Sequence, residues 1–189
     1  MSWKNDQVTE SETNKILEFA KECLSLEGDF VELGCYKGDT SLLLAEVLVE
    51  KGVEKSAKKL WIYDSFEGLP EKSDYDESVL GKEFRGGELC VTKREVKERF
   101  LRAGLPVPVI KKAWFSELTD KDLPEGIAFA FLDGDFYESI KTSLELVGSR
   151  MVNGGVIVVH DYNNPALPGV KRAVDEWGLA KRSLRIVKL

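Results

Sequence analysis

The stretch Ile127–Glu145, "IAFAFLDGDFYESIKTSLE", contains the change of pattern that decides the fold. Its first six residues are all apolar, which is typical of a strand buried on both faces of a parallel sheet. From Asp135 to Val147 the apolar residues recur at helical spacing, so a helix is expected there. Asp133 and Asp135 lie between the two elements, where the buried strand reaches solvent. A strand that passes directly into a helix predicts an α/β fold with a ligand site near this junction.

Strands and helices alternate along the rest of the chain. The other expected strands are Asp29–Leu33, Lys59–Tyr63, Val107–Lys111, Gly154–Val159 and Ser183–Leu189. The other expected helices are Thr13–Leu26, with Ser11 as its candidate N-cap, Thr40–Glu50, Thr92–Ala103 and Gly169–Gly178. At least three strands are continuously apolar. We therefore expect a Rossmann-like, doubly wound and mostly parallel sheet with helices on both faces.

A chain of 189 residues suits one domain, residues 1–189, with a helical N-terminal segment over residues 1–27. Residues 65–90 lack any hydrophobic periodicity and contain several glycines. An irregular segment of this length in a compact domain is typical of a lid or a binding loop. We expect a lid insertion that closes over the site, with Tyr75, Phe84 and Arg85 as candidates for substrate contacts.

Composition argues against several classes of protein. The net charge of −6 disfavours a nucleic-acid partner, because phosphate binding requires a basic surface. Three widely spaced cysteines without zinc-site spacing fit a reducing compartment. No stretch has the apolar character of a signal peptide or the length of a membrane span. We expect a cytoplasmic protein with neither nucleic acid nor membrane as partner.

A glycine loop follows the first expected strand. Gly34 and Gly38 are spaced G-x-x-x-G, which is neither the G-x-G-x-x-G of dinucleotide folds nor a P-loop. Asp64, at the end of the second strand, is placed to accept hydrogen bonds from ribose hydroxyls. A ribose-binding acid without a phosphate cradle indicates a nucleoside that lacks a pyrophosphate, of which S-adenosylmethionine (SAM) is the common one. The alternative is that the glycines serve only a tight turn.

Acidic residues and the single histidine lie at the ends of the later strands. An unpaired charge is costly at a buried strand end, so Asp133 favours a divalent cation, with Asp161 as a second ligand. His160 could be a ligand that shifts the preference from Mg²⁺ toward Mn²⁺, Fe²⁺ or Zn²⁺, a base, or a structural residue. Asp135 and Glu138 fit a capping box, so capping is the alternative to a chemical role for Asp135.

Six strings occur in order in the chain: "VELGCYKGDTSLLLA", "IYDSFEGLP", "AWFSEL", "FLDGDFYESIKTSLELV", "GGVIVVHDY" and "PGVKRAVDEW". Together they resemble the class I SAM-dependent methyltransferases of the macrocin O-methyltransferase family, which act on sugars of macrolide and aminocoumarin natural products. The resemblance covers roughly residues 29–178. The second and fourth strings carry most of its specificity, since the glycine loop is shared by the whole superfamily.

The resemblance implies roles for individual residues. It implies SAM binding by Glu32, Gly34, Tyr36, Gly38, Asp64, Ser65, Asp133 and, beside the adenine, Trp114 and Phe115. It implies that Asp135 is the general base and that Asp133 and Asp161 are metal ligands. His160 stands where the family has an aspartate, and it is a candidate ligand or catalytic residue. The family fold also carries a longer N-terminal segment and a final antiparallel strand beyond Leu189.

These observations predict a SAM-dependent O-methyltransferase that acts on a hydroxyl of a small molecule such as a natural-product sugar. A divalent cation, Mg²⁺ before Mn²⁺ or another metal, is the expected second cofactor. A homodimer is left open. Two alternatives are a SAM-binding module without catalysis, against which the intact acids argue, and a nicotinamide-dependent oxidoreductase, against which the missing G-x-G-x-x-G argues.

Overall fold

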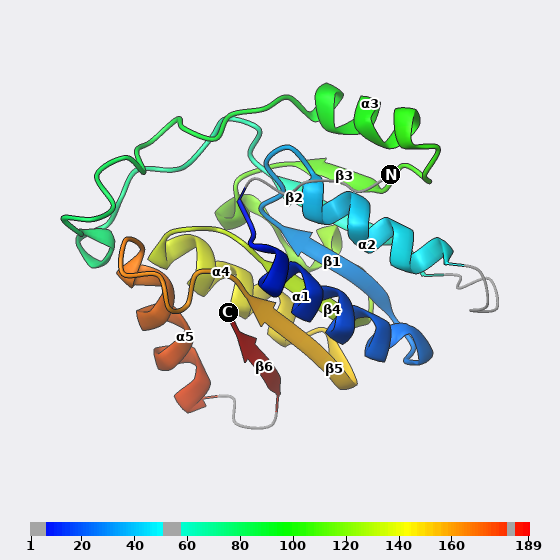
Figure 1. The fold of residues 1–189 in the computed structure, drawn as a ribbon. Coiled ribbons are helices and arrows are strands. Elements are labelled where there is room, and N and C mark those ends of the chain that lie inside the picture. Colours follow the sequence, from blue (N-terminus) through cyan, green and yellow to red (C-terminus); the bar gives the residue numbers. More distant parts are fainter. Residues whose placement is uncertain (1–6, 51–57, 181–183) are drawn as a thin grey trace.

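The structure, a computed structural model, describes residues 7–50, 58–180 and 184–189. Within them a six-stranded sheet has the order β3-β2-β1-β4-β5-β6 (Figure 1). The strands are β1 Asp29–Leu33, β2 Leu60–Asp64, β3 Val109–Lys112, β4 Ile127–Leu132, β5 Met151–Val159 and β6 Arg185–Lys188. The α-helices are α1 Glu10–Glu22, α2 Asp39–Val49, α3 Lys93–Ala103, α4 Tyr137–Gly148 and α5 Pro168–Ala180. Every pairing in this sheet is parallel, so the predicted fold class is confirmed.

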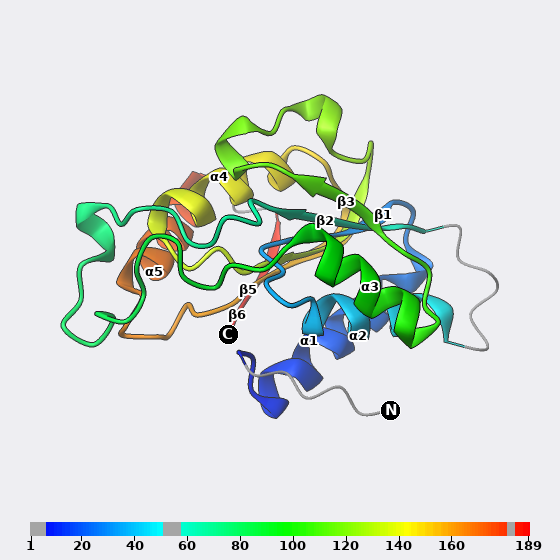
Figure 2. The same cartoon turned by 90° about the horizontal axis from the view of Figure 1, so that it is seen from above.

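Helices cover both faces of the sheet, and the side chains of β4 show why. Phe129 and Phe131 pack into one hydrophobic core together with residues of α1, α2 and α3. Ala130 and Leu132 pack into a second core with residues of α4 and α5. Successive side chains of a strand point to opposite faces, so a fully apolar strand must be covered on both. Figure 2 shows the two helical layers on either side of the sheet.

The strand order reverses between β1 and β4, which lie side by side in the centre of the sheet. The chain runs outward from β1 to β2 and β3, and then returns to β4 and continues to β5 and β6. In such sheets ligands bind outside the carboxyl ends of the strands at this reversal. The backbone N–H of Asp133 donates to the carbonyl of Leu33 at 2.9 Å, so the two strands stay paired up to this point.

The start of α1 differs from the prediction. The helix begins at Glu10, and Thr9 rather than Ser11 is its N-cap. The Thr9 hydroxyl accepts from the N–H of Glu12, and the Glu12 carboxylate accepts from the N–H of Thr9 at 3.0 Å. Thr9 and Glu12 form a capping box, whereas Ser11 is followed three residues later by Asn14 and not by the Glu or Gln of that motif.

The start of α4 also differs, and this changes the role of Asp135. The helix begins at Tyr137 with Phe136 as its N-cap, so the predicted capping box of Asp135 and Glu138 is wrong. The carboxylate of Asp76 instead accepts the N–H of Tyr137 at 2.7 Å. Asp76 is 1% exposed and comes from the segment 65–90. A negative charge at a helix N-terminus is stabilising, so a distant residue serves as the cap.

We expect Asp76→Ala to lower the free energy of unfolding by roughly 2–3 kcal/mol, because a buried backbone donor loses a charged acceptor. The Asp76 carboxylate also accepts from the N–H and hydroxyl of Ser73, so the loop before it should loosen as well. Urea denaturation measures the stability, and limited proteolysis within residues 65–90 measures the loosening. Asp74→Ala, an exposed neighbour, is the matched control and should change neither.

The segment 65–90 is tied to the helices behind it. The hydroxyl of Ser78 donates to the carbonyl of Pro165 at 2.8 Å. A side chain at Gly81 would begin 2.1 Å from the carbonyl oxygen of Ala166, so the two loops are in close contact. Tyr75 packs under the guanidinium of Arg172, 3.8 Å from its ring centre. That this segment closes as a lid stays a prediction.

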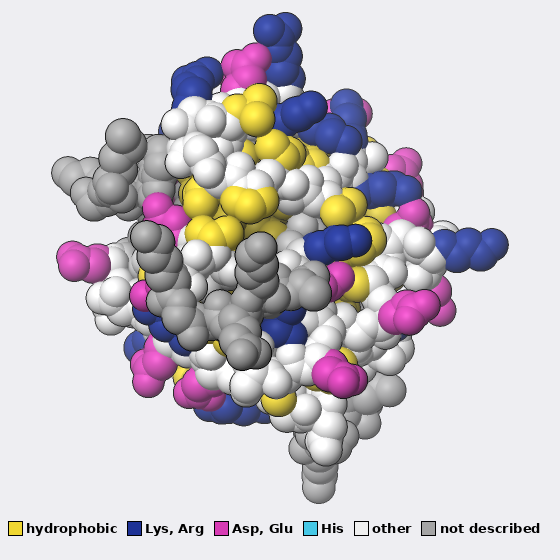
Figure 3. Space-filling model, turned by 90° about the vertical axis from the view of Figure 1, so that its right-hand side faces the viewer, with side chains coloured by type: hydrophobic (Ala, Val, Ile, Leu, Met, Phe, Trp, Pro, Cys, Tyr) yellow, Lys and Arg dark blue, Asp and Glu magenta, His cyan; other side chains and the backbone are white. Residues whose placement is uncertain are grey.

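Three exposed hydrophobic residues lie in α3 and around β3: Leu101 on the helix, Val107 before the strand and Val109 within it. On the face of the molecule seen in Figure 3, hydrophobic side chains form small groups separated by charged ones. The edge strand is only four residues long and ends in two lysines, which discourages pairing with another strand. The possible homodimer, which the sequence left open, is not tested by this edge. No helix among the described residues is long and apolar enough to cross a membrane.

Candidate active site

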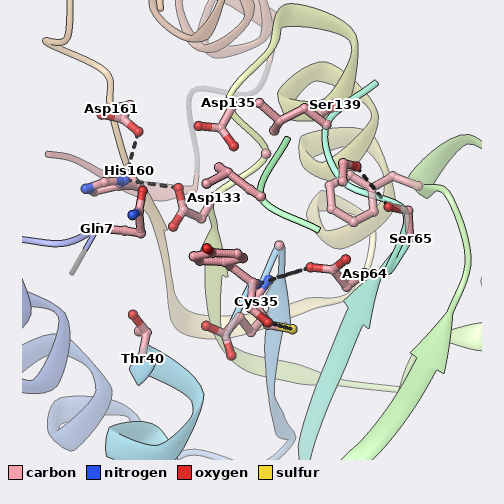
Figure 4. Close-up of a pocket in the computed structure, with 18 of the residues that line it drawn as sticks. Gln7, Cys35, Thr40, Asp64, Ser65, Asp133, Asp135, Ser139, His160 and Asp161 are labelled. Carbon is pink, nitrogen blue, oxygen red and sulfur yellow. Dashed lines mark hydrogen bonds and ion pairs between the residues drawn. The ribbon is translucent and has the colours of Figure 1, made fainter. Parts of the chain in front are cut away.

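A pocket opens at the carboxyl ends of β1, β2, β4 and β5 (Figure 4). The structure brings nearly all of the predicted site residues to its wall: Glu32, Gly34, Tyr36, Asp64, Ser65, Trp114, Phe115, Asp133, Asp135, His160 and Asp161. Gly38 does not line the pocket; it precedes α2 with φ +80, and its Cα faces Val96 of α3. Phe84 lines the pocket as predicted for a substrate contact, whereas Tyr75 and Arg85 do not.

Several residues of the pocket wall were not predicted from the sequence. Gln7 and Val8, which precede α1, line the pocket, as do Leu69 and Leu89 of the segment 65–90 and Asn164 after β5. Of these residues, only Asn164 could have been recognised from the sequence as a site residue, because it is polar and follows soon after a strand end. The others are placed by long-range packing, which local sequence patterns do not reveal.

The glycine loop is shaped by close contact between β1 and β4. Gly34 has φ +89, and a Cβ there would lie 1.9 Å from the carbonyl oxygen of Asp133. The neighbouring strand β4 by itself therefore requires glycine at this position. The carboxylate of Asp64 accepts the N–H of Cys35 at 2.9 Å and that of Tyr36 at 3.3 Å, which holds the loop against β2.

Two residues near this loop, Glu32 and Ser65, form hydrogen bonds with other groups of the protein. Glu32 is 1% exposed and accepts a hydrogen bond from the hydroxyl of Ser41. Burial raises the pKa of Glu32 to about 8, which favours its neutral form near pH 7. The Ser65 hydroxyl donates to the carbonyl of Gly68 at 3.0 Å and shapes the start of the segment 65–90. These contacts position the wall of the pocket.

His160 forms the centre of a charged cluster. Its Nδ1 lies 3.0 Å from Oδ1 of Asp133 and 2.9 Å from Oδ2 of Asp161, and its Nε2 lies 3.8 Å from a carboxylate oxygen of Glu12. Burial lowers the pKa of His160, but Asp133 and Asp161 outweigh this effect and raise the pKa to about 11. Burial raises the pKa of Asp161, but hydrogen bonds from His160 and Asn164 bring it below its ordinary value.

Asp135 completes the cluster without taking part in helix capping. Its φ is +59, a left-handed conformation that aspartate tolerates better than most residues. Burial, followed by the charges of Asp133 and Asp161, raises the pKa of the Asp135 carboxyl well above its ordinary value. Figure 4 shows the three carboxylates gathered on the side of the pocket that carries His160. A carboxylate with a raised pKa in a pocket is suited to accept a proton near neutral pH.

Comparison with known proteins identifies the family. The family described as Macrocin-O-methyltransferase (TylF) matches residues 14–185, which is most of the chain. The chain belongs to the macrocin O-methyltransferase family. The prediction made from the sequence strings is thus confirmed.

Individual members of the macrocin O-methyltransferase family show how close the relation is. A tetracenomycin-C 4'-O-methyltransferase from Streptomyces olivaceus, which is named for a dimethoxy-rhamnosyl substrate, is 34% identical over 79% of this chain and 58% of its own length. Demethyldecarbamoylnovobiocin O-methyltransferase from Streptomyces niveus is 27% identical over 86% of this chain and 65% of its own length. The chain therefore spans about three fifths of the length of these relatives.

Solved structures agree with this family assignment. The O-methyltransferase NovP superposes with a TM-score of 0.73 at 26% identity, covering 87% of this chain and 71% of its own. The calicheamicin methyltransferase CalS11 superposes with a TM-score of 0.72 at 19% identity, covering 88% of this chain and 70% of its own. The second likeness concerns the fold alone. Both place the six-stranded sheet among the class I methyltransferase folds.

Proposed function

We propose that this protein is a SAM-dependent O-methyltransferase that acts on a hydroxyl group of a small molecule, with a sugar of a natural product as the first candidate. Membership of the family supports the reaction type. The names of the two relatives, which refer to a rhamnosyl-tetracenomycin and to a novobiocin precursor, support the substrate class. The observation that carries the proposal is Asp135, which faces the charged cluster and caps no helix.

The residues of the pocket fit SAM. Oδ2 of Asp64 accepts the two loop amides and Oδ1 accepts the N–H of Phe66 at 2.7 Å, which leaves one acceptor position of the carboxylate, on Oδ1, for a ribose hydroxyl. Trp114 and Phe115 add aromatic side chains to the pocket wall, against which a flat adenine would pack. When bound, SAM would supply a methyl group on a positively charged sulfur, which an oxygen nucleophile takes in one in-line displacement. The acids Asp133 and Asp135, which line the pocket, suit a positively charged cofactor.

The donor set at His160 fits a divalent cation. The ligand atoms of Asp133, His160 and Asp161 all lie within 4.8 Å of one another. Two carboxylates with one imidazole suit Mg²⁺ or Mn²⁺, and the imidazole shifts the preference toward Mn²⁺, Fe²⁺ or Zn²⁺. A cation held there would polarise a substrate hydroxyl and lower its pKa.

Asp135 is the proposed general base. Its carboxylate would take the proton of the substrate hydroxyl, whose oxygen then forms the new bond to carbon. The raised pKa of Asp135 strengthens it as a base, and the nearby charge of His160 opposes that rise and keeps the anion accessible. The segment 65–90, through Phe84 and Leu89, would exclude water from the reaction. We also propose a cytoplasmic location, as the composition predicts.

The test of the proposed function separates it from its rivals. Calorimetry with SAM and with NAD identifies the cofactor: we expect binding of SAM and none of NAD, and the reverse would favour an oxidoreductase. Labelled SAM is then incubated with sugars, catechols and polyketide glycosides, with and without divalent metal. Transfer of label to a sugar hydroxyl supports the proposal. Binding of SAM without transfer to any of these acceptors would favour a non-catalytic module.

A further inference from the structure

The loop from Gly34 to Asp39 has a backbone that needs support. Three of its residues have positive φ angles: Gly34 at +89°, Tyr36 at +44° and Gly38 at +80°. Tyr36 is the unusual one, because a side chain with a Cβ is disfavoured in the left-handed region. Such a conformation persists only where surrounding contacts enforce it.

The loop is held from two opposite sides. On the side of the pocket, Asp64 accepts the N–H groups of Cys35 and Tyr36, as drawn for Cys35 in Figure 4. On the outer side, a terminal guanidinium nitrogen of Arg99 donates to the carbonyl of Lys37 at 2.6 Å. The other terminal nitrogen of Arg99 forms an ion pair with the carboxylate of Asp39, the first residue of α2.

The contact of Arg99 is well shielded from water. The Asp39 side chain is 9% exposed and that of Arg99 is 26% exposed. Val96 and Phe100, which lie on the same face of α3, are fully buried, and Val96 packs against Gly38. A charge-assisted pair in this setting is stronger than an ion pair on the open surface.

We propose that Arg99 is a positioning residue that holds the glycine loop in the shape that binds the cofactor. This inference rests on the proposed function, since SAM is the cofactor concerned. Asp64 would have to share its carboxylate between the loop amides and the ribose hydroxyls. Arg99 itself does not line the pocket, although Lys37 and Asp39 do, so it can hold the loop without competing for a ligand. Its planar fork reaches a carbonyl and a carboxylate at once, which a lysine cannot reproduce.

Three variants test the proposal by calorimetry with SAM. Arg99→Met keeps the length of the side chain and removes the guanidinium; Arg99→Lys keeps the charge with one donor group. We expect Arg99→Met to weaken SAM binding by roughly 10- to 100-fold, the range for loss of a charge-assisted hydrogen bond, and Arg99→Lys to fall between it and wild type. At saturating SAM, kcat should stay within about threefold of wild type, because the reacting groups are untouched.

Arg102→Met is the matched control. Arg102 lies on the same helix with a side chain that is 74% exposed, and within the described part of the chain its ion pair is with Glu98 of that helix at 3.2 Å. It should bind SAM as wild type does. An equal loss of affinity in the two methionine variants would show that α3 matters only for stability, and this would overturn the proposal.

A second measurement does not depend on SAM. Hydrogen exchange of the free protein should be at least about tenfold faster at residues 35–39 in Arg99→Met than in wild type, while β4 keeps its protection. The N–H of Gly38, which donates to the carbonyl of Cys35 at 2.6 Å, is the reporter. Unchanged exchange overturns the positioning role even if SAM proves not to be the cofactor. If Arg99→Met does not fold, Arg99→Lys decides the matter by both measurements.

Discussion

Replacing Asp135 by asparagine is expected to lower turnover by roughly 10²–10⁴-fold, the usual contribution of a general base. The amide has nearly the same shape but cannot accept the proton of the substrate hydroxyl. Asparagine tolerates the left-handed backbone at this position about as well as aspartate. No capping hydrogen bond is lost, because α4 is not capped by Asp135. Single-turnover rates with labelled SAM measure the effect, and SAM binding should persist.

The stability of the same variant should depend on pH in a defined direction. Burial and the charge of Asp133 raise the pKa of Asp135 in the folded protein. The folded state therefore binds this proton more tightly than the unfolded state, and wild type loses stability as pH rises from about 4 toward the raised pKa. Asp135→Asn should be at least as stable as wild type at pH 7, and its advantage should shrink toward pH 4 in denaturant titrations.

Glu138→Gln is the control for Asp135→Asn. It removes a carboxylate from the first turn of the same helix, but its side chain is exposed and does not line the pocket. It should leave turnover unchanged. If Asp135→Asn turns over at nearly the wild-type rate, Asp135 is not the base.

The elements that could be predicted from sequence are those set by local patterns. The apolar run of β4 and the helical spacing after it gave the central strand and α4 to within two residues at each end. The convergence of acids on one rim followed from the rule that parallel strands end at the same edge. In the strand order β1 lies between β2 and β4. Asp64, at the end of β2, and Asp133, after β4, therefore lie on either side of the glycine loop that follows β1.

The features that sequence did not reveal depend on contacts between distant parts of the chain. Asp135 with Glu138 is a reasonable capping pair, yet Asp76 takes the place from 61 residues away. No local pattern in the irregular segment 65–90 marks that residue. In the same way Gly34 was expected to face a ligand, whereas the carbonyl of Asp133 already excludes a side chain there. In both cases, the cap of α4 and the glycine at position 34, contacts between distant residues decide which of two locally reasonable interpretations holds.

Two alternative roles are proposed for Asp133, and a single substitution can separate them. Its carboxylate could hold a cation with His160 and Asp161, or it could serve only as the ion-pair partner of His160, whose Nδ1 is 3.0 Å away. Asp133→Asn keeps an oxygen that can accept from His160 but removes the charge that binds a hard cation. A metal site predicts that the variant needs more metal, whereas an ion pair predicts a defect that metal cannot correct.

We expect chelation to abolish methyl transfer by wild type and added Mg²⁺ or Mn²⁺ to restore it. Asp133→Asn should then require at least roughly 100-fold more metal for half of its maximal rate, because a first ligand counts for more than the outer contacts that cost 10–100-fold. Asp161→Asn should behave in the same way, and Asp120→Asn, an exposed acid with a side chain 76% exposed, should behave as wild type. Wild-type activity that is indifferent to chelation would remove the cation. Asp133 and Asp161 would then act by holding the His160 imidazolium beside the substrate, and both asparagine variants should stay impaired at every metal concentration.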